Sequence, residues 1–163
     1  MFSIRNASIA DIPLIRELNL QVWPQTYASI LSEAQISYML DMMYSEASLE
    51  KQMAEGCQFV IVYDEDIPVG FASYQEITPA VFKLHKIYVL VSQQGKGTGR
   101  FLLDHVVNAA QERGGSSLQL QVNLNNKAKN FYEKLDFTVI DQVNIDIGNG
   151  YFMNDYIMEK KIS

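Results

Sequence analysis

The residues Gln94-Gly95-Lys96-Gly97-Thr98-Gly99-Arg100 lie between a predicted strand over 81–90 and a predicted helix ending at Arg113. Glycines at this point let backbone N–H groups approach a bulky anion closely. The helix start adds unpaired N–H donors and the positive end of the helix dipole. Lys96 and Arg100 add charge. The stretch therefore predicts a site for a diphosphate.

Two common nucleotide-binding motifs do not fit the spacing of these glycines. A P-loop requires G-x-x-x-x-G-K-[ST], but Gly95-Lys96 is followed by Gly97. In the dinucleotide fingerprint G-x-G-x-x-G, the third glycine would fall on Arg100 or on Leu102. The diphosphate must therefore belong to another class of ligand.

Hydrophobic periodicity and turn residues predict a mixed sheet flanked by helices over one domain, residues 1–163. Asp11 with Pro13 predicts the start of one helix, Ser32 caps a second, and a third short helix follows Ser48. Asn125 is expected to cap a last helix that ends at Leu135. The predicted strands cover 2–6, 58–63, 69–75, 81–90, 118–122, 137–147 and 151–162.

Composition excludes several classes of protein. The chain has 163 residues, of which 48% are hydrophobic and 20% charged, as in ordinary globular domains. No run of ~20 apolar residues predicts a membrane span, and no secretory signal is visible. Cys57 is the only cysteine, which rules out an internal disulfide and a multi-cysteine metal site. We expect a cytoplasmic protein without a metal.

Charge is unevenly distributed along the chain. The net charge of −6 argues against nucleic acid as a partner. The segment 83–134 nevertheless holds eight basic and three acidic residues, whereas the remainder holds five basic and sixteen acidic ones. The first segment suits an anion and the remainder favours a cation.

A second motif follows the glycine stretch and reads Asn125-Asn126-Lys127-Ala128-Lys129-Asn130-Phe131-Tyr132-Glu133-Lys134-Leu135-Asp136-Phe137. Together the two resemble the pyrophosphate loop and the N-x-x-A-x-x-F-Y-E-K-L-G-F segment of the GNAT superfamily of acetyl-CoA-dependent N-acetyltransferases. The resemblance implies a mixed, mostly antiparallel α/β (α+β) sheet of about seven strands with four or five helices, and a homodimer. One departure is Asp136 in place of glycine, where a positive φ would strain the backbone.

The resemblance also implies how acetyl-CoA is bound. Backbone groups of Ile87, Tyr88 and Val89 would pair with the pantetheine arm where two strands separate. Asn125 would hydrogen-bond this arm and Lys134 would approach the phosphates. Gln94 would also bind the cofactor, and the pyrophosphate would lie on the N–H groups of Gly95, Lys96, Gly97, Thr98, Gly99 and Arg100.

For catalysis, the resemblance implies that the amine attacks acetyl-CoA directly in a ternary complex, with Tyr132 as the general acid. Many members carry a glutamate base at positions that here hold His85 and Gln121. Gln121 cannot take a proton, so His85, a water chain or Glu76 remains as the proton acceptor. Cys57 has no recognisable base partner, which argues against an acetyl-cysteine.

The acceptor site is expected at Trp23, Thr26, Tyr27 and Tyr74, where aromatic faces and the acidic excess suit a cation. The chain resembles the polyamine and ribosomal-protein branch, so a polyamine or other small amine is the first interpretation. A protein N-terminus or lysine, an aminoglycoside and an amino-acid-like amine stay open. So do two other classes, a regulatory module that binds acetyl-CoA without turnover and an assembly protein.

Overall fold

Seven strands form one sheet in the order β1-β2-β3-β4-β5-β7-β6 in the computed structural model, which describes residues 1–163. Every neighbouring pair is antiparallel except β4 and β5, which are parallel. This arrangement confirms the mixed, mostly antiparallel sheet. The strands are β1 (Phe2–Asn6), β2 (Gln58–Asp64), β3 (Ile67–Thr78), β4 (Val81–Val89), β5 (Ser117–Asn123), β6 (Thr138–Gly148) and β7 (Tyr151–Lys161).

Five α-helices accompany the sheet. Ser32 caps α2 as predicted, because its hydroxyl accepts a hydrogen bond from the Gln35 N–H at 3.1 Å. The start of α3 was predicted too late, since the hydroxyl of Ser45 caps it by accepting from the Ser48 N–H. The helices are α1 (Ile12–Tyr27), α2 (Glu33–Tyr44), α3 (Glu46–Ala54), α4 (Thr98–Glu112) and α5 (Ala128–Lys134).

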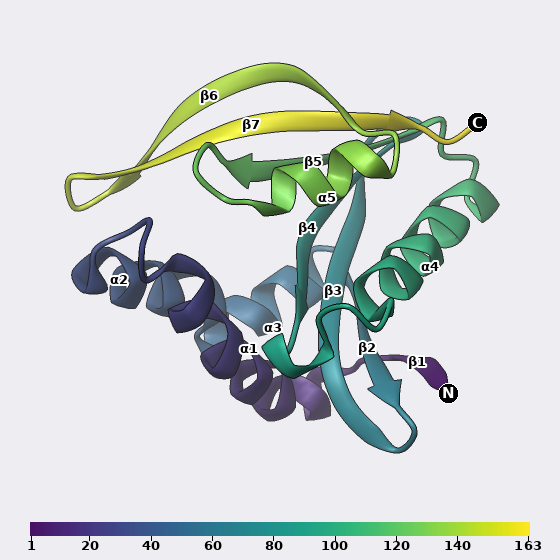
Figure 1. Cartoon of the computed structure of the whole chain (residues 1–163), viewed down its shortest axis with the longest axis horizontal. Coiled ribbons are helices and arrows are strands. Elements are labelled where there is room, and N and C mark those ends of the chain that lie inside the picture. Colours follow the sequence, from purple (N-terminus) through teal and green to yellow (C-terminus); the bar gives the residue numbers. More distant parts are fainter.

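The sheet separates two hydrophobic cores (Figure 1). Helices α1, α2 and α3 cover one face, where Ile15, Leu49 and Phe71 are fully buried. Helix α4 covers the other face, with Leu102 and Val106 packed against the sheet. Each core therefore holds one group of helices rigidly on its side of the strands.

The strands β4 and β5 separate partway along their length. They pair only from Val81 with Ser117 to Leu84 with Leu120, and then diverge (Figure 1). His85 is an extra residue in β4 at this point, because Lys86 pairs with Ser73 while Leu84 pairs with Tyr74. A β-bulge bends its strand. The bulge thus lies where the sheet opens, and the open edge of β4 keeps unpaired backbone groups.

Asp136, which stands where the family that the sequence resembles usually has glycine, has a positive φ. Its φ is 71°, in the left-handed region, directly after α5. The N–H of Phe137 donates to the carbonyl of Tyr132 at 3.1 Å, which closes the end of the helix. The aspartate therefore carries backbone strain that glycine would avoid.

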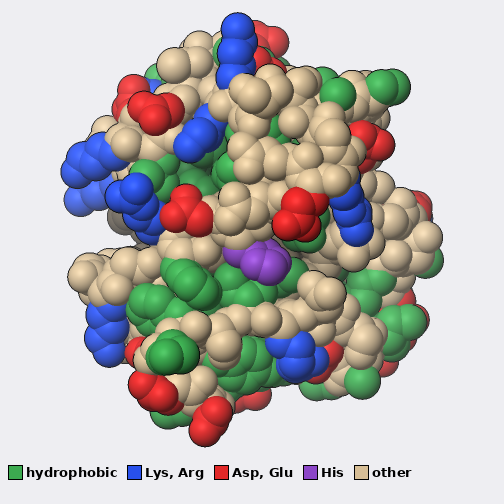
Figure 2. Space-filling model, turned by 90° about the vertical axis from the view of Figure 1, so that its right-hand side faces the viewer, with side chains coloured by type: hydrophobic (Ala, Val, Ile, Leu, Met, Phe, Trp, Pro, Cys, Tyr) green, Lys and Arg blue, Asp and Glu red, His purple; other side chains and the backbone are tan.

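The surface shows no dominant charge on the face that includes α4. Lysine, arginine and acidic side chains lie side by side there, around a group of hydrophobic side chains (Figure 2). None of the helices has the length and apolar character required to traverse a bilayer.

Candidate active site

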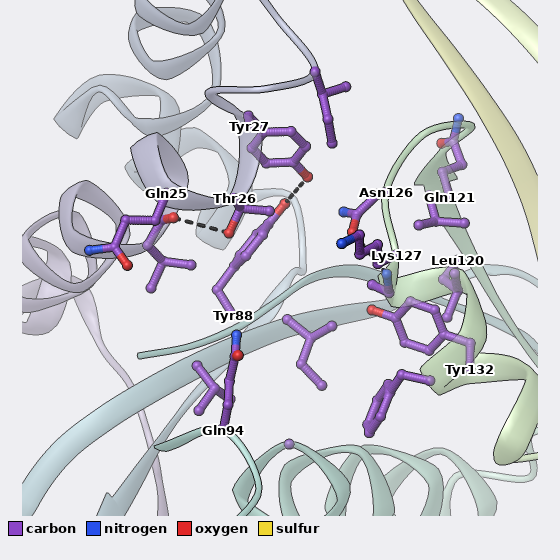
Figure 3. A pocket seen from close by; sticks show the side chains of 18 of the residues that line it. Gln25, Thr26, Tyr27, Tyr88, Gln94, Leu120, Gln121, Asn126, Lys127 and Tyr132 are labelled. Atoms are coloured by element: carbon purple, nitrogen blue, oxygen red, sulfur yellow. Dashed lines mark hydrogen bonds between the residues drawn. The ribbon is translucent and has the colours of Figure 1, made fainter. Parts of the chain in front are cut away.

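A cavity of about 750 Å³ lies where β4 and β5 diverge. Side chains of α1 form one wall, and α5 forms the opposite wall (Figure 3). The start of α4 closes one end at Gly99. The predicted site residues that line it are His85, Ile87, Tyr88, Val89, Gln94, Gly99, Asn125, Tyr132, Thr26 and Tyr27.

The glycine stretch presents free backbone donors beside this cavity. Gly97 is the N-cap of α4 with φ 84°, a left-handed conformation that suits glycine, and no side chain caps the helix. The N–H groups of Gly97, Thr98, Gly99 and Arg100 make no backbone hydrogen bond. A Cβ at Gly95 or Gly97 would meet nothing within 4 Å. The stretch is therefore an open cradle for an anion.

The basic side chains of the stretch lie at its rim. The Lys96 ammonium is 3.9 Å from the Asp64 carboxylate, and Arg100 is 3.8 Å from Asp104 on its own helix. Both side chains are more than half exposed. Neither lines the cavity, and Lys134 is also exposed outside it. Binding of a diphosphate therefore depends first on the backbone amides.

Tyr132 projects from α5 into the cavity (Figure 3). Its ring packs edge-on against Phe131 and Phe137, with centroids at 5.4 and 5.7 Å, so the ring position is fixed. Burial is the main cause that raises the pKa of Tyr132 above its ordinary value, and Tyr27 raises it further by a smaller amount. The phenol is therefore protonated at neutral pH and can act as a proton donor.

The structure corrects the prediction for Asn125. Helix α5 begins at Ala128, and Asn126 instead accepts from the Ala128 N–H at 2.9 Å. The N–H of Asn125 donates to the Asn123 side chain, which forms a turn ahead of the helix. Asn125 still lines the cavity, so its side chain is not used as a cap and is available to a ligand.

A second, smaller cavity of about 90 Å³ adjoins the first. The two share Tyr27, His85, Tyr88 and Gln121 among their lining residues. The hydroxyls of Tyr27 and Tyr88 lie 3.1 Å apart and point toward one another (Figure 3). This tyrosine pair stands between the large cavity and the small one, which faces α1 and α2.

His85 and Gln121 occupy the boundary between the cavities, as the resemblance implied for the base position. The side-chain oxygen Oε1 of Gln121 accepts a hydrogen bond from the Lys83 ammonium at 2.6 Å. The His85 Nε2 atom lies 3.2 Å from the side-chain oxygen Oε1 of Gln75. Burial, then Lys83 and Lys86, lowers the pKa of His85 to about 4. Its imidazole is thus neutral but weakly basic.

The predicted acceptor residues divide among three places. Trp23 and Tyr27 line the small cavity, with ring centroids 4.6 Å apart. Thr26 lines the large cavity, and its hydroxyl donates to the Val22 carbonyl of its own helix. Tyr74 lies in the core on the α4 side and lines neither cavity. Tyr74 lies two residues after Ala72 on β3, so regular strand alternation places both side chains in this core.

Two charged residues of the small cavity were not singled out from the sequence. Lys86 is 9% exposed and its ammonium lies 4.8 Å from the centre of the Tyr44 ring. Asp155 is 4% exposed and lies opposite Asn123 across β5 and β7. Strand alternation places charged residues on a face but says nothing of their partners. The only available signal was a charge at a position that alternation predicts to be buried.

Comparison with known proteins agrees with this geometry. The family model "Acetyltransferase (GNAT) domain" matches residues 27–158. A spermidine N(1)-acetyltransferase of Thermoplasma acidophilum is 27% identical over 164 residues, covering 97% of this chain and 96% of that protein. A ribosomal protein bS18 alanine N-acetyltransferase of Haemophilus influenzae is 34% identical over 73 residues, 45% of this chain and 49% of that protein.

A solved structure has the same fold over its whole length. The PaiA N-acetyltransferase of Thermoplasma acidophilum in complex with coenzyme A superposes with a TM-score of 0.83 at 26% identity, covering 99% of each chain. Three findings agree. The N–H groups at the start of α4 are free, strands β4 and β5 diverge, and the family model matches. The chain belongs to the GNAT family of acetyl-CoA-dependent N-acetyltransferases.

Proposed function

We propose that this enzyme transfers the acetyl group of acetyl-CoA to a primary amine by direct attack, with both substrates bound at once. The observation that carries the proposal is the meeting of two cavities at the opening between β4 and β5. One cavity ends at free helix amides that suit a diphosphate, and the other is lined by buried charged groups. The reacting groups would meet at the shared wall.

The donor fits the residues of the large cavity. The unpaired amides from Gly97 to Arg100 would hold the pyrophosphate. The open edge of β4 beyond Leu84 offers backbone groups to the amides of the pantetheine arm, in the manner of an added strand. Asn125 would bind the same arm with its free side chain. When bound, acetyl-CoA supplies an activated thioester.

Residues of the chain then carry out the proton transfers. The amine nitrogen forms a bond to the acetyl carbon as the bond from that carbon to sulfur breaks. Tyr132 gives its proton to the departing thiolate and regains one from the attacking nitrogen through water. The N–H of Val89 would polarise the thioester carbonyl. Since an alkylammonium has a pKa of ~10.4, one further proton must leave before attack.

His85 is a weak choice for the base that removes this proton. A histidine whose pKa is about 4 holds almost no proton at pH 7, so it gives little driving force for taking one from an ammonium. Gln121 cannot accept a proton and is held by Lys83. The base must therefore be another group that lines the small cavity, or water.

The identity of the acceptor is a separate matter. A polyamine, the first interpretation of the sequence, is supported by the spermidine-acetylating relative. A peptide N-terminus is supported by the relative that acts on a ribosomal-protein alanine. Lys83 and Lys86 near the acceptor side oppose a polycation by charge repulsion.

The direct test is an assay of CoA release with a panel of polyamines, amino acids, peptides and aminoglycosides. We expect saturable release of CoA with at least one amine, together with an acetylated product of matching mass. Binding of acetyl-CoA without any turnover would instead favour a regulatory module. Absence of binding would contradict the assignment of the large cavity.

A further inference from the structure

The small cavity holds two buried charges of opposite sign that do not pair with each other. Asp155 and Lys86 both line it, yet no ion pair within 4.0 Å joins them or links either to another residue. Burying an ion costs free energy unless a partner of opposite charge compensates it. Lys83 acts on Asp155 without forming an ion pair, so two charges that lack a direct partner on the walls of one cavity point to a ligand that carries both complements.

Asp155 is placed where an attacking amine would enter. It shares its sheet face with Asn123, which it opposes, and with Gln121 two residues away on β5. Its carboxylate makes no hydrogen bond, and burial raises its pKa to about 6, with Lys83 acting in the opposite direction. A carboxylate of this kind can both bind an ammonium and take a proton from it.

Lys86 lies on the other side of the same cavity. Its ammonium faces the Tyr44 ring and has no carboxylate partner. Burial is the main cause that lowers its pKa to about 8, so the charged form still predominates at pH 7. Lys83 adds a second positive charge nearby, fixed by Gln121. An anionic group of the ligand would relieve this positive charge.

We propose that the acceptor is an amine that also carries a carboxylate, of amino-acid type, with its amine received by Asp155 and its carboxylate by Lys86. This inference rests on the proposed acetyl transfer. Asp155 takes one proton from the ammonium, and the freed nitrogen attacks the acetyl carbon as described above. Asp155 then releases its proton to solvent, so each turnover yields one N-acetyl amino acid, one CoA and one proton.

The size and lining of the cavity agree with such a head group. A volume of about 90 Å³ accommodates a small group and not a long polyamine or several sugar rings. Besides the two charges and the polar side chains of Gln35, His85, Gln121 and Asn123, the walls include apolar side chains that adapt to varied shapes. These side chains are Leu31, Met39, Met43, Phe152 and Met153.

The experiment compares each of the common amino acids with its amide and its decarboxylated amine, with spermidine included. The rate of CoA release is measured over a range of acceptor concentrations at fixed acetyl-CoA. We expect kcat/KM for the preferred amino acid to exceed that of its amide and of its amine by at least about tenfold. Equal values for all three forms would overturn the inference.

Variants then assign the recognition to residues. Lys86→Met should lower kcat/KM for the amino acid about tenfold or more, while leaving the decarboxylated amine unchanged or faster. Lys51→Met, on the exposed surface of α3, is the control and should change neither value. If Lys86→Met slows both acceptors equally, Lys86 is merely structural and the inference fails.

Asp155→Asn tests the second half of the proposal, that Asp155 receives the amine. We expect kcat/KM to fall for the amino acid and the amine alike, because both depend on the amine site. Retained turnover of both would contradict the role of Asp155. Failure of the inference is distinguishable from failure of the proposed function: acetylation of amines without a carboxylate preference refutes only the former, whereas no acetylation of any amine refutes both.

Discussion

The donor and acceptor sides of the opening between β4 and β5 are built in different ways. The donor side consists mainly of backbone groups, the free amides before α4 and the open edge of β4, and most of it comes from residues 85–100. The acceptor side consists of side chains brought together from α1, α2, β4, β5 and β7. A backbone site is tied to a short local motif, whereas a side-chain site depends on the whole fold.

This difference explains why one enzyme family can keep its donor and change its acceptor. Backbone amides are insensitive to most substitutions, whereas under our proposal a single buried charge such as Lys86 would alter which acceptor is tolerated. Variants on the two sides should therefore affect different measurements, cofactor affinity on one and acceptor selectivity on the other.

The largest effect is expected from Gly97→Glu on the donor side. The substitution forces a non-glycine residue to φ 84° and places a carboxylate at the start of α4, where a diphosphate would bind. We expect the Kd for acetyl-CoA to rise at least ~100-fold, equivalent to ~2.7 kcal/mol. Isothermal titration calorimetry gives this value directly.

Gly150→Glu is the matched control for this variant. Gly150 has φ 79° and open space around it, so the backbone strain is the same, but it lies in the β6–β7 hairpin. Its affinity for acetyl-CoA should match the unaltered enzyme. An equal loss in both variants would show that strain alone causes it and would break the donor assignment.

Tyr132→Phe tests the point where the two sides meet. Removing the phenol should lower kcat ~100-fold, within the range for loss of a general acid, with little change in acetyl-CoA affinity. Tyr74→Phe serves as the control, because Tyr74 is a buried tyrosine that lines neither cavity. Unchanged kcat in Tyr132→Phe would exclude the acid role.

On the acceptor side, Asp155 predicts a pH dependence. Its carboxylate must be deprotonated to accept a proton, and its pKa is about 6, so kcat/KM should fall as the pH drops through 6. In Asp155→Asn this fall on the acidic side of the pH profile (the acid limb) should disappear. At pH 7, kcat/KM should be reduced by at most ~10-fold. A limb that persists near pH 6 in the variant would assign it to a different group.

The smallest effect concerns stability. The pKa of Lys86 is about 8 in the folded protein and ~10.4 when unfolded, so the unfolded chain binds more protons between these values. The free energy of unfolding should therefore gain a contribution from Lys86 as the pH rises from 8 to 9.5. Lys86→Met should lack it and be more stable at pH 7 by roughly 2 kcal/mol. Urea titrations at several pH values measure both quantities.

The parts of the fold that the sequence predicted are those with local causes. The glycine stretch and the cap at Ser32 depend on residues a few positions apart. The errors arose where two polar residues compete for one role. Ser45 rather than Ser48 begins α3, and Asn126 rather than Asn125 serves α5.

The acceptor site was predicted less well because it depends on long-range placement. Strand alternation puts Tyr74 on the same face of β3 as Ala72, but the sequence does not reveal which face meets α4. Asp155 and Lys86 lie 69 positions apart in the chain and meet only through the order of β4, β5 and β7. The lack of an ion pair at either residue is visible only once the side chains are packed.

One structure tests the central claim most directly, that of the enzyme with CoA bound. We predict the pyrophosphate on the amides between Gly97 and Arg100, the pantetheine arm along the open edge of β4, and the thiol within hydrogen-bonding distance of the Tyr132 hydroxyl. CoA bound elsewhere, or a thiol far from Tyr132, would contradict the account.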